Sequence, residues 1–164
     1  MGISMRLYLA PDSDLRAFTG APRTLHLWLR YPRTPADAWL HESWRDLATL
    51  LAASPFAPPN SPLTPAGADW TYPSAADHGA HALTPAATQQ LLQAIEQIDR
   101  KDVEAHVRKR WAALSAEHGL SPDLTVDQLS AGTDELLGYL ACLEDACTRA
   151  RTRGYGLLMA LWEL

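Results

Sequence analysis

Two short runs of histidine and acidic residues are the parts of this 164-residue chain best suited to chemistry. The first run, His41-Glu-Ser-Trp-Arg45, begins like the His-Glu-x-x-His motif, in which two histidines one helical turn apart share a zinc ion. Arg45 stands where the second histidine is required, so this run predicts no zinc site. Glu42 and Arg45, three residues apart, are instead expected to form a surface ion pair.

The second run, His78-Gly-Ala-His81, places two potential metal donors three residues apart, with Asp69 and Asp77 nearby. A catalytic zinc ion needs three protein ligands in a defined geometry, and two loop histidines do not supply that. We therefore expect histidines that bond to backbone or water, and neither a bound metal nor another cofactor. As titratable groups, these two histidines and His41 remain the acid–base or ligand candidates if the protein is an enzyme.

Motifs of nucleotide and ester chemistry are incomplete. Gly154-Tyr-Gly156 lacks the third glycine of the dinucleotide fingerprint, and it follows an expected helix instead of preceding one. The sequence contains neither the phosphate-binding Gly-Lys-Ser/Thr ending nor a Gly-x-Ser-x-Gly nucleophile turn. We assign no catalytic residue from the sequence.

Basic residues gather in Arg100-Lys101 and Arg108-Lys-Arg110, which are the segments best placed to contact phosphates. Asp99, Asp102 and Glu104 interleave with them, and the formal net charge of the chain is -5. A solvated helix face explains this pattern better than a nucleic-acid interface does. We expect no nucleic-acid partner.

Composition favours a cytoplasmic protein with its own core. Hydrophobic residues make up 47% of the chain, and the sequence has no apolar run of the ~18 residues that a membrane helix needs. Cys142 and Cys147 lie five residues apart in one expected helix, at least ~7.5 Å along its axis, so they are expected to be free thiols. Free thiols are typical of the cytosol. We expect no signal peptide and no membrane partner.

Strands and helices alternate in the N-terminal part. Residues 3–9 and 24–30 each alternate apolar with polar side chains, which predicts two strands with one buried face each. A short helix from 11 to 18, ended by Gly20, separates them. Residues 36–53 predict a helix with one apolar stripe directed at the core. The stripe consists of Leu40, Trp44, Leu47 and Leu51.

Three helices and a strand are expected in the C-terminal half. The helices begin at Thr84, at Asp99 or Asp102, and at Thr133, and the last two end at Gly119 and Gly154. The apolar side of the middle helix consists of Val103, Val107, Trp111 and Leu114. Residues 157–164 are nearly all apolar and predict a buried strand. Strands at both ends with helices between them predict a single-domain α+β fold. Its small, mostly antiparallel sheet includes both terminal strands and is covered by four to five helices.

Residues 54–83 differ from the rest of the chain. They contain six prolines, and no helical or strand period survives there. Long segments of this kind within one domain are commonly functional or disordered. Phe56, Trp70 and Tyr72 favour a segment that packs, because disordered tracts are poor in aromatic residues. The predicted organisation is one domain over residues 1–164 with a proline-rich loop at 54–83.

Two stretches carry a family resemblance. The opening Met-Gly-Ile-Ser-Met strand and the run Leu40-His-Glu-Ser-Trp-Arg-Asp-Leu-Ala-Thr-Leu-Leu51 are similar to the YfbM-like family, a group of bacterial proteins classified as a domain of unknown function. Leu83-Thr-Pro85 at a helix start and the final helix-glycine-strand ending also match. His41-Glu42 replaces the Asp-Lys pair that family members tend to carry. The resemblance implies a single α+β domain and no particular activity, cofactor or catalytic residue.

A non-catalytic binding or protein-interaction module is the function that these observations favour. Exposed aromatics are enriched at binding surfaces, and the long loop carries several of them. The expected contacts to an unknown protein or small-molecule partner are Trp70, Tyr72, Asp77, His78, His81 and His41. The alternative is a small-molecule or metal-dependent enzyme with its site between the 54–83 loop and the 36–53 helix.

Overall fold

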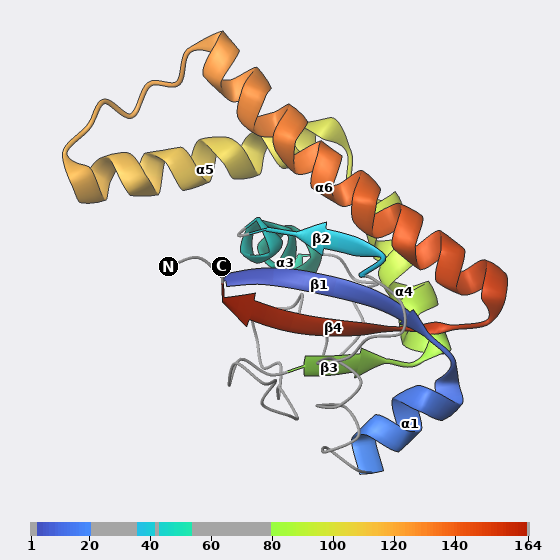
Figure 1. Ribbon diagram of the computed structural model, residues 1–164. Helices are drawn as coiled ribbons and strands as arrows, with labels where there is room; N and C mark the ends of the chain where they lie inside the picture. Colours follow the sequence, from blue (N-terminus) through green and yellow to red (C-terminus); the bar gives the residue numbers. More distant parts are fainter. Residues whose placement is uncertain (1–2, 21–35, 42, 54–79, 164) are drawn as a thin grey trace.

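The computed structural model describes residues 3–41, 43–53 and 80–163, except 21–35 (Figure 1). Among these residues, four strands form one antiparallel sheet in the order β2-β1-β4-β3. Their bounds are β1 Ile3–Ala10, β2 Ala38–Leu40, β3 Ala80–Leu83 and β4 Gly156–Glu163. The two central strands are the terminal ones, so the prediction that both chain ends share one sheet is confirmed.

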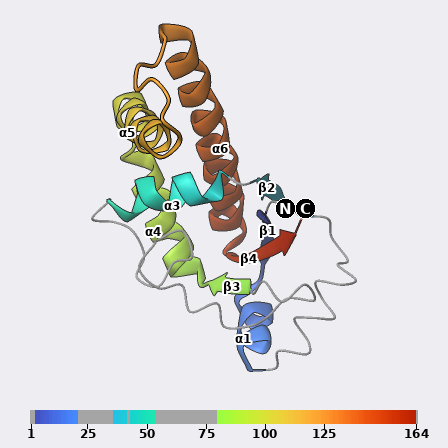
Figure 2. The same ribbon diagram turned by 90° about the vertical axis from the view of Figure 1, so that its left-hand side faces the viewer.

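Helices in the described residues lie mainly on one side of the sheet. Their bounds are α1 Asp12–Gly20, α3 Trp44–Ala52, α4 Pro85–Glu96, α5 Arg100–His118 and α6 Val126–Arg153. Figures 1 and 2 show α3, α4 and α6 beside the sheet, whereas α5 and the first half of α6 extend past it. The α+β class and the number of helices agree with the prediction. No helix of the described ranges is long and apolar enough to cross a membrane.

The central strand β1 is buried on both faces. Leu7 pairs with Met159 of β4 and joins the main core, which α3, α4 and α6 complete. Its neighbour Tyr8 faces the other way and packs with Leu15 and Phe18 of α1 in a second core cluster. The prediction of one buried face is therefore incomplete, because α1 covers apolar side chains on the opposite face of the sheet.

The expected helix over 36–53 is two elements. Its first part is the edge strand β2, whose Leu40 pairs with Met5 of β1, and α3 begins only at Trp44. The backbone of β1 offers an edge for hydrogen bonding, and pairing with it overrides the helical pattern. All four stripe residues still reach the core: Leu40, Leu47 and Leu51 are buried, and Trp44 packs against them.

Capping residues explain where the later helices begin. Thr84 accepts a hydrogen bond from the amide of Ala87, at the expected helix start. Of the two predicted caps of α5, Asp99 is the N-cap, and Asp102 completes a reciprocal capping box with it. The predicted start of α6 at Thr133 is wrong, because Thr125 and Gln128 form a capping box two turns earlier. Thr133 is instead fully buried inside the helix.

Strand β3 is an element that the sequence did not predict. It occupies the last four residues of the interval 54–83 and pairs with β4, His81 lying opposite Met159. Three parts of the predictions lie outside the described residues: positions 54–79 of that interval, the expected strand at 24–30, and Glu42, the expected ion-pair partner of Arg45.

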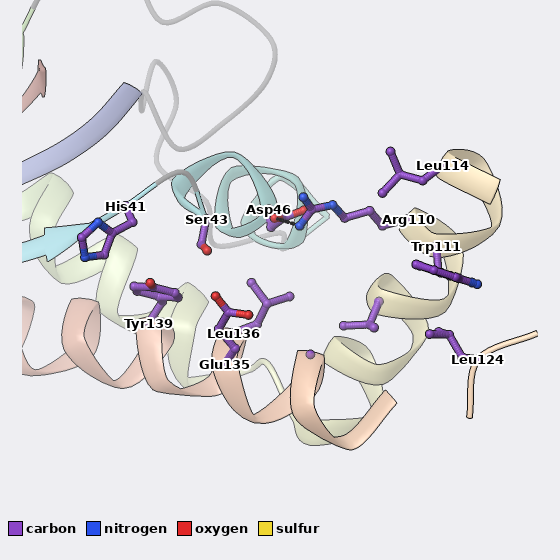
Figure 3. A pocket seen from close by; sticks show the side chains of 12 residues that line it. His41, Ser43, Asp46, Arg110, Trp111, Leu114, Leu124, Glu135, Leu136 and Tyr139 are labelled. Atoms are coloured by element: carbon purple, nitrogen blue, oxygen red, sulfur yellow. Dashed lines mark hydrogen bonds and ion pairs between the residues drawn. The ribbon is translucent and has the colours of Figure 1, made fainter. Parts of the chain in front are cut away.

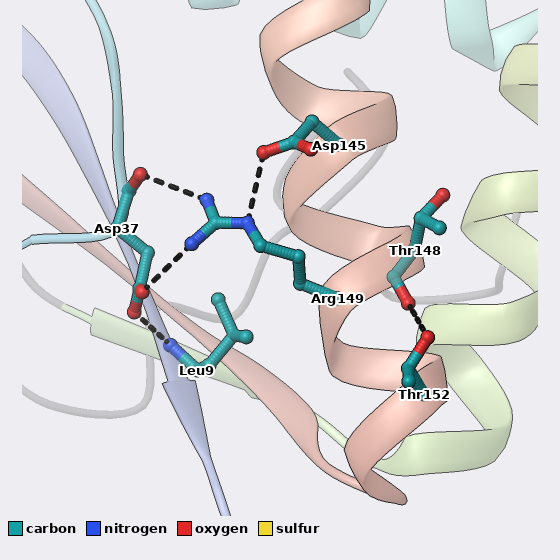
Figure 4. Close-up of polar contacts among 6 residues, drawn as sticks. All are labelled: Leu9, Asp37, Asp145, Thr148, Arg149 and Thr152. Atoms are coloured by element: carbon teal, nitrogen blue, oxygen red, sulfur yellow. Dashed lines mark hydrogen bonds and ion pairs between the residues drawn. The ribbon is translucent and has the colours of Figure 1, made fainter.

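A polar cluster around Asp37 joins β1, the start of β2 and α6 (Figure 4). The Asp37 carboxylate accepts from the backbone N–H of Leu9 at 2.7 Å and from the Arg149 guanidinium at 3.2 Å. Arg149 also donates to the backbone carbonyl of Asp37 at 3.1 Å and to the Asp145 carboxylate at 2.8 Å. We call these four residues the Asp37 cluster. It satisfies a backbone donor of a central strand while it attaches α6 to the sheet.

Candidate functional site

A cavity of about 450 Å³ lies where α3, α5 and α6 meet beyond the sheet. We call it the α5–α6 cavity. Its lining residues are His41, Ser43, Asp46, Val107, Arg110, Trp111, Leu114, Leu124, Gly132, Glu135, Leu136 and Tyr139. The volume is within the range of small-molecule sites, roughly 300–1,000 Å³.

The apolar side of α5 packs in the main core at its N-terminal end and lines the α5–α6 cavity farther along. Val103, near the start of the helix, is fully buried in the main core. Val107, Trp111 and Leu114 line the α5–α6 cavity, and Leu114 is 38% exposed. The apolar side of α5 therefore runs from the main core, against which Val107 still packs, into a cavity that Leu114 leaves partly open to solvent.

Polar and apolar side chains occupy opposite ends of this cavity (Figure 3). His41, Ser43 and Tyr139 lie at one end, and Trp111, Leu114 and Leu124 at the other. Trp111 donates its indole N–H to the backbone carbonyl of Ser121 at 3.2 Å, so its polar atom is satisfied and its ring contributes apolar surface. The cavity therefore has an amphipathic lining.

Between the two ends lies a buried carboxylate, Asp46, which is 8% exposed. Its Oδ1 is 3.0 Å from Nε2 of His106, and its Oδ2 accepts from the Arg110 guanidinium. We call these three residues the Asp46 cluster. Because a buried carboxylate is costly without partners, the two α5 side chains stabilise Asp46 where α3 meets α5.

A second cavity of about 550 Å³ lies on the other side of the Asp46 cluster. We call it the α3–α5 cavity. It is lined by Thr49, Leu50, Ala53, Gln97, Ile98, Asp102, Ala105, His106, Lys109, Arg110 and Ala113. Arg110 lines both cavities, so the cluster separates them and contributes side chains to each.

His41 is the predicted contact residue that the structure places in a cavity. It directly follows β2, and its ring meets that of Tyr139 edge-on, with centroids 6.1 Å apart. His81 lies in β3, which is at the opposite edge of the sheet from β2. The sheet therefore keeps the two histidines apart. The other predicted contacts, Trp70, Tyr72, Asp77 and His78, lie outside the described residues.

Sequence reasoning missed Asp46, His106 and Glu135. Asp46 and His106 are 60 positions apart, and no local pattern joins them. Arg110 was expected on a solvated basic face, but it turns one edge of its guanidinium toward Asp46. A signal did exist for the cavity lining, because Val107, Trp111 and Leu114 of the predicted apolar stripe on α5 line the cavity.

Cysteine and metal chemistry gain no support from the described residues. Both cysteines are free thiols, as expected, with Cys142 exposed and Cys147 buried. Burial, and then the nearby Glu144 carboxylate, raises the pKa of Cys147 to about 12, so this thiol stays protonated and unreactive. No group of three histidine, cysteine or acidic residues gathers in a way suited to a metal ion within the described ranges.

Comparison with known proteins bears on the fold. No protein-family model matches the chain, and no curated protein matches it. The structure is similar to the crystal structure of YfbM from Escherichia coli, a protein of unknown function, with a TM-score of 0.62. The two share 15% sequence identity over 99% of this chain and 100% of that one. The fold is YfbM-like.

A shared YfbM-like fold at this identity says nothing about ligands, because functional sites vary widely on one fold. The fold does account for the position of the α5–α6 cavity, since α5 and the first half of α6 extend past the sheet. The chemistry of the site has to be argued from its own lining residues.

Proposed function

We propose that this protein is a non-catalytic binding module whose α5–α6 cavity takes a small amphipathic organic molecule. One observation carries the proposal: the apolar side of α5 continues from the core into a cavity with a polar end. Sites for small molecules combine apolar walls with a few convergent polar groups, and this cavity has both. An amphipathic ligand matches the two ends in a single orientation.

Apolar surface supplies the affinity in this proposal. A ligand body that covers Trp111, Leu114 and Leu124 removes their side chains from water, which contributes roughly 25 cal/mol per Å² of apolar area. The polar end then fixes orientation through His41 and Ser43. Binding of this kind needs no reactive group, which is why we place a binding module ahead of an enzyme.

A fragment screen with backbone-amide NMR tests this function. We expect hits whose shift changes map to the residues lining the α5–α6 cavity. Leu124→Trp fills the apolar end and should abolish these hits. Leu120→Trp is the matched control, because Leu120 is 56% exposed in the same connection and does not line the cavity. A diverse library without hits, or hits unaffected by Leu124→Trp, would overturn the proposal.

The contacts predicted in the proline-rich loop are a separate part of the same function. Trp70 and Tyr72 are expected to contact a protein partner, independently of the cavity. Capture of partners from lysate should therefore weaken in a Trp70→Ala, Tyr72→Ala double variant and remain in Leu124→Trp. Equal capture by the double variant and the wild type would remove the loop from the proposal.

An acid–base enzyme is the second candidate, favoured by the Asp46–His106 contact. A carboxylate bonded to one ring nitrogen fixes the orientation of a histidine, as in many hydrolases. Here the His106 ring lines the α3–α5 cavity. We rank this candidate lower, because Arg110 occupies the second oxygen of the carboxylate.

Turnover of an ester and phosphoester panel decides between the candidates. An enzyme that uses His106 should lose activity in His106→Gln and keep it in His118→Gln, a matched change at the exposed end of α5. Absence of turnover by the wild-type protein would exclude hydrolysis of these substrate classes.

A further inference from the structure

We infer that the ligand of the α5–α6 cavity carries a cationic head, a primary amine or an ammonium group, held at the polar end by Glu135 and Tyr139. The inference rests on the proposed function and specifies the class of ligand that this site takes. It is carried by the charge balance of the lining and by the side chains around one carboxylate.

Glu135 is the carboxylate in the lining that has no counter-charge. The α5–α6 cavity contains the acidic residues Asp46 and Glu135 and the basic residue Arg110. Arg110 and Asp46 are paired with each other. Glu135 forms no ion pair with any residue in the described ranges, so the lining has one negative charge more than positive ones when His41 is counted as neutral. Glu135 is exposed, so a cation that enters the cavity meets a solvated carboxylate with no protein counter-charge among the described residues.

The geometry around Glu135 fits an organic cation. Figure 3 shows its carboxylate reaching from α6 toward Ser43, the residue before α3, beside the Tyr139 ring. Tyr139 follows Glu135 by one helical turn, and residues four apart share a helix face. Aromatic rings attract cations within about 6 Å of their centroid, so carboxylate and ring act on the same head group. The Ser43 hydroxyl adds an acceptor for an ammonium N–H.

An anionic head fits this end less well. The permanently charged cation of the lining is Arg110, whose guanidinium already donates to Asp46. An anion that approached Arg110 would also face Glu135 across the cavity and lose affinity through repulsion. The formal net charge of -5 over the chain acts in the same direction.

Three probes with one apolar body and different heads test the inference: phenylbutylamine, phenylbutanol and phenylbutyrate. Affinities are measured by NMR titration of the residues that line the cavity. We expect the amine to bind most tightly, the alcohol next and the carboxylate most weakly. Added salt should lower the affinity of the amine and leave that of the alcohol unchanged, because salt screens only the interaction between charged groups.

Two variants with the same change of charge locate the effect. Glu135→Gln should weaken the amine by about three- to tenfold and leave the alcohol unchanged, as for loss of one partly exposed charged contact. Glu144→Gln removes an exposed carboxylate from the same helix, outside the cavity, and should change none of the three affinities.

Failure of this inference is distinguishable from failure of the proposed function. If all three probes bind in the cavity with equal affinity, or the carboxylate binds best, the cationic head is wrong and the binding module stands. If Glu144→Gln weakens the amine as much as Glu135→Gln does, the head is not held by Glu135. If no probe shifts the lining residues, both proposals fall together.

Discussion

Asp37 and Asp46 lie nine residues apart in the interval that the sequence predicts as one helix, and each meets an arginine from a distant helix. Asp37 bonds the backbone N–H of Leu9 in the central strand, and Arg149 binds both its side chain and its backbone carbonyl. Asp46 bonds two side chains of α5, His106 and Arg110. The Asp37 cluster therefore joins side chains to main-chain groups of β1 and of the residue before β2, whereas the Asp46 cluster joins only side chains, which also line cavities.

We expect the loss of Asp37 to cost more stability than the loss of Asp46, although exposure alone would predict the reverse. The Asp46 side chain is 11% exposed and that of Asp37 is 21% exposed. The partners of the two carboxylates differ in mobility, and this difference outweighs the difference in exposure. A strand amide cannot move to find water, but an arginine that is 55% exposed can rotate toward solvent. We infer that the Asp37 cluster serves the fold and that the Asp46 cluster serves the cavities.

The largest effect is expected from Asp37→Ala. It leaves the Leu9 N–H without its acceptor and removes one contact of Arg149, which should lower the free energy of unfolding by about 2–3 kcal/mol. Urea denaturation measures this. Asp145→Ala is the control, because Asp145 is 66% exposed and contacts the same arginine, and its effect should be much smaller. Equal effects would show that the contact to Leu9 contributes nothing.

Asp46→Ala should cost less, about 1–2 kcal/mol, since water in the adjoining cavities can reach the released partners. A double-mutant cycle with His106→Ala should give a coupling energy of about 1 kcal/mol for the pair. If Asp46→Ala destabilises the protein more than Asp37→Ala does, then burial of the carboxylate, and not the mobility of its partners, sets the cost. The division of roles between the two clusters would then be wrong.

Cys147 lies on α6 two residues before Arg149 and reports on the same comparison. In a Cys142→Ser background that is otherwise wild type, labelling of Cys147 by a thiol reagent should be slow, because burial raises its pKa to about 12. Asp37→Ala should speed labelling by loosening the contact between α6 and the sheet. Asp46→Ala should leave the rate near that of the background protein.

The raised pKa of Cys147 also predicts a pH dependence. The unfolded thiol loses its proton near pH 9 and the folded thiol only near pH 12. The folded state therefore keeps the proton longer, and this contribution to stability is full below pH 9 and is lost as the pH rises toward 12. The difference in unfolding free energy between wild type and Cys147→Ala should narrow over that range. A constant difference would contradict the shift.

Elements with strong local signals were predictable from the sequence. The alternating pattern of β1, the cap at Thr84 and the glycine stops at Gly119 and Gly154 all depend on residues within a few positions of one another. Gly119 and Gly154 adopt φ of 64° and 66°, a conformation that glycine accepts without strain. Such signals are local in the sequence, so they can be read without knowing how the chain folds.

Elements that depend on distant partners were not predictable. Strand β2 forms because β1 offers an edge, and β3 forms because β4 does. Both strands have only three or four residues, too few to show a period of their own. The site has the same origin: Asp46, His106 and Glu135 come from three helices, and only the meeting of those helices brings them to one place.

The smallest effect is expected at a third arginine–carboxylate contact, Arg100 with Asp134. Their nitrogen and oxygen are 2.8 Å apart, as close as in the Asp37 cluster, but the side chains are 49% and 60% exposed. Both are already hydrated, so Asp134→Ala should leave the urea midpoint unchanged. Because Arg100 also contacts Glu104, a double variant with Glu104→Ala excludes compensation by that residue. A shift in the double variant comparable to that of Asp46→Ala would mean that charge pairing alone stabilises these helices. If the midpoint is unchanged, the loss of stability in Asp37→Ala and Asp46→Ala comes from the buried donors that each change leaves without an acceptor.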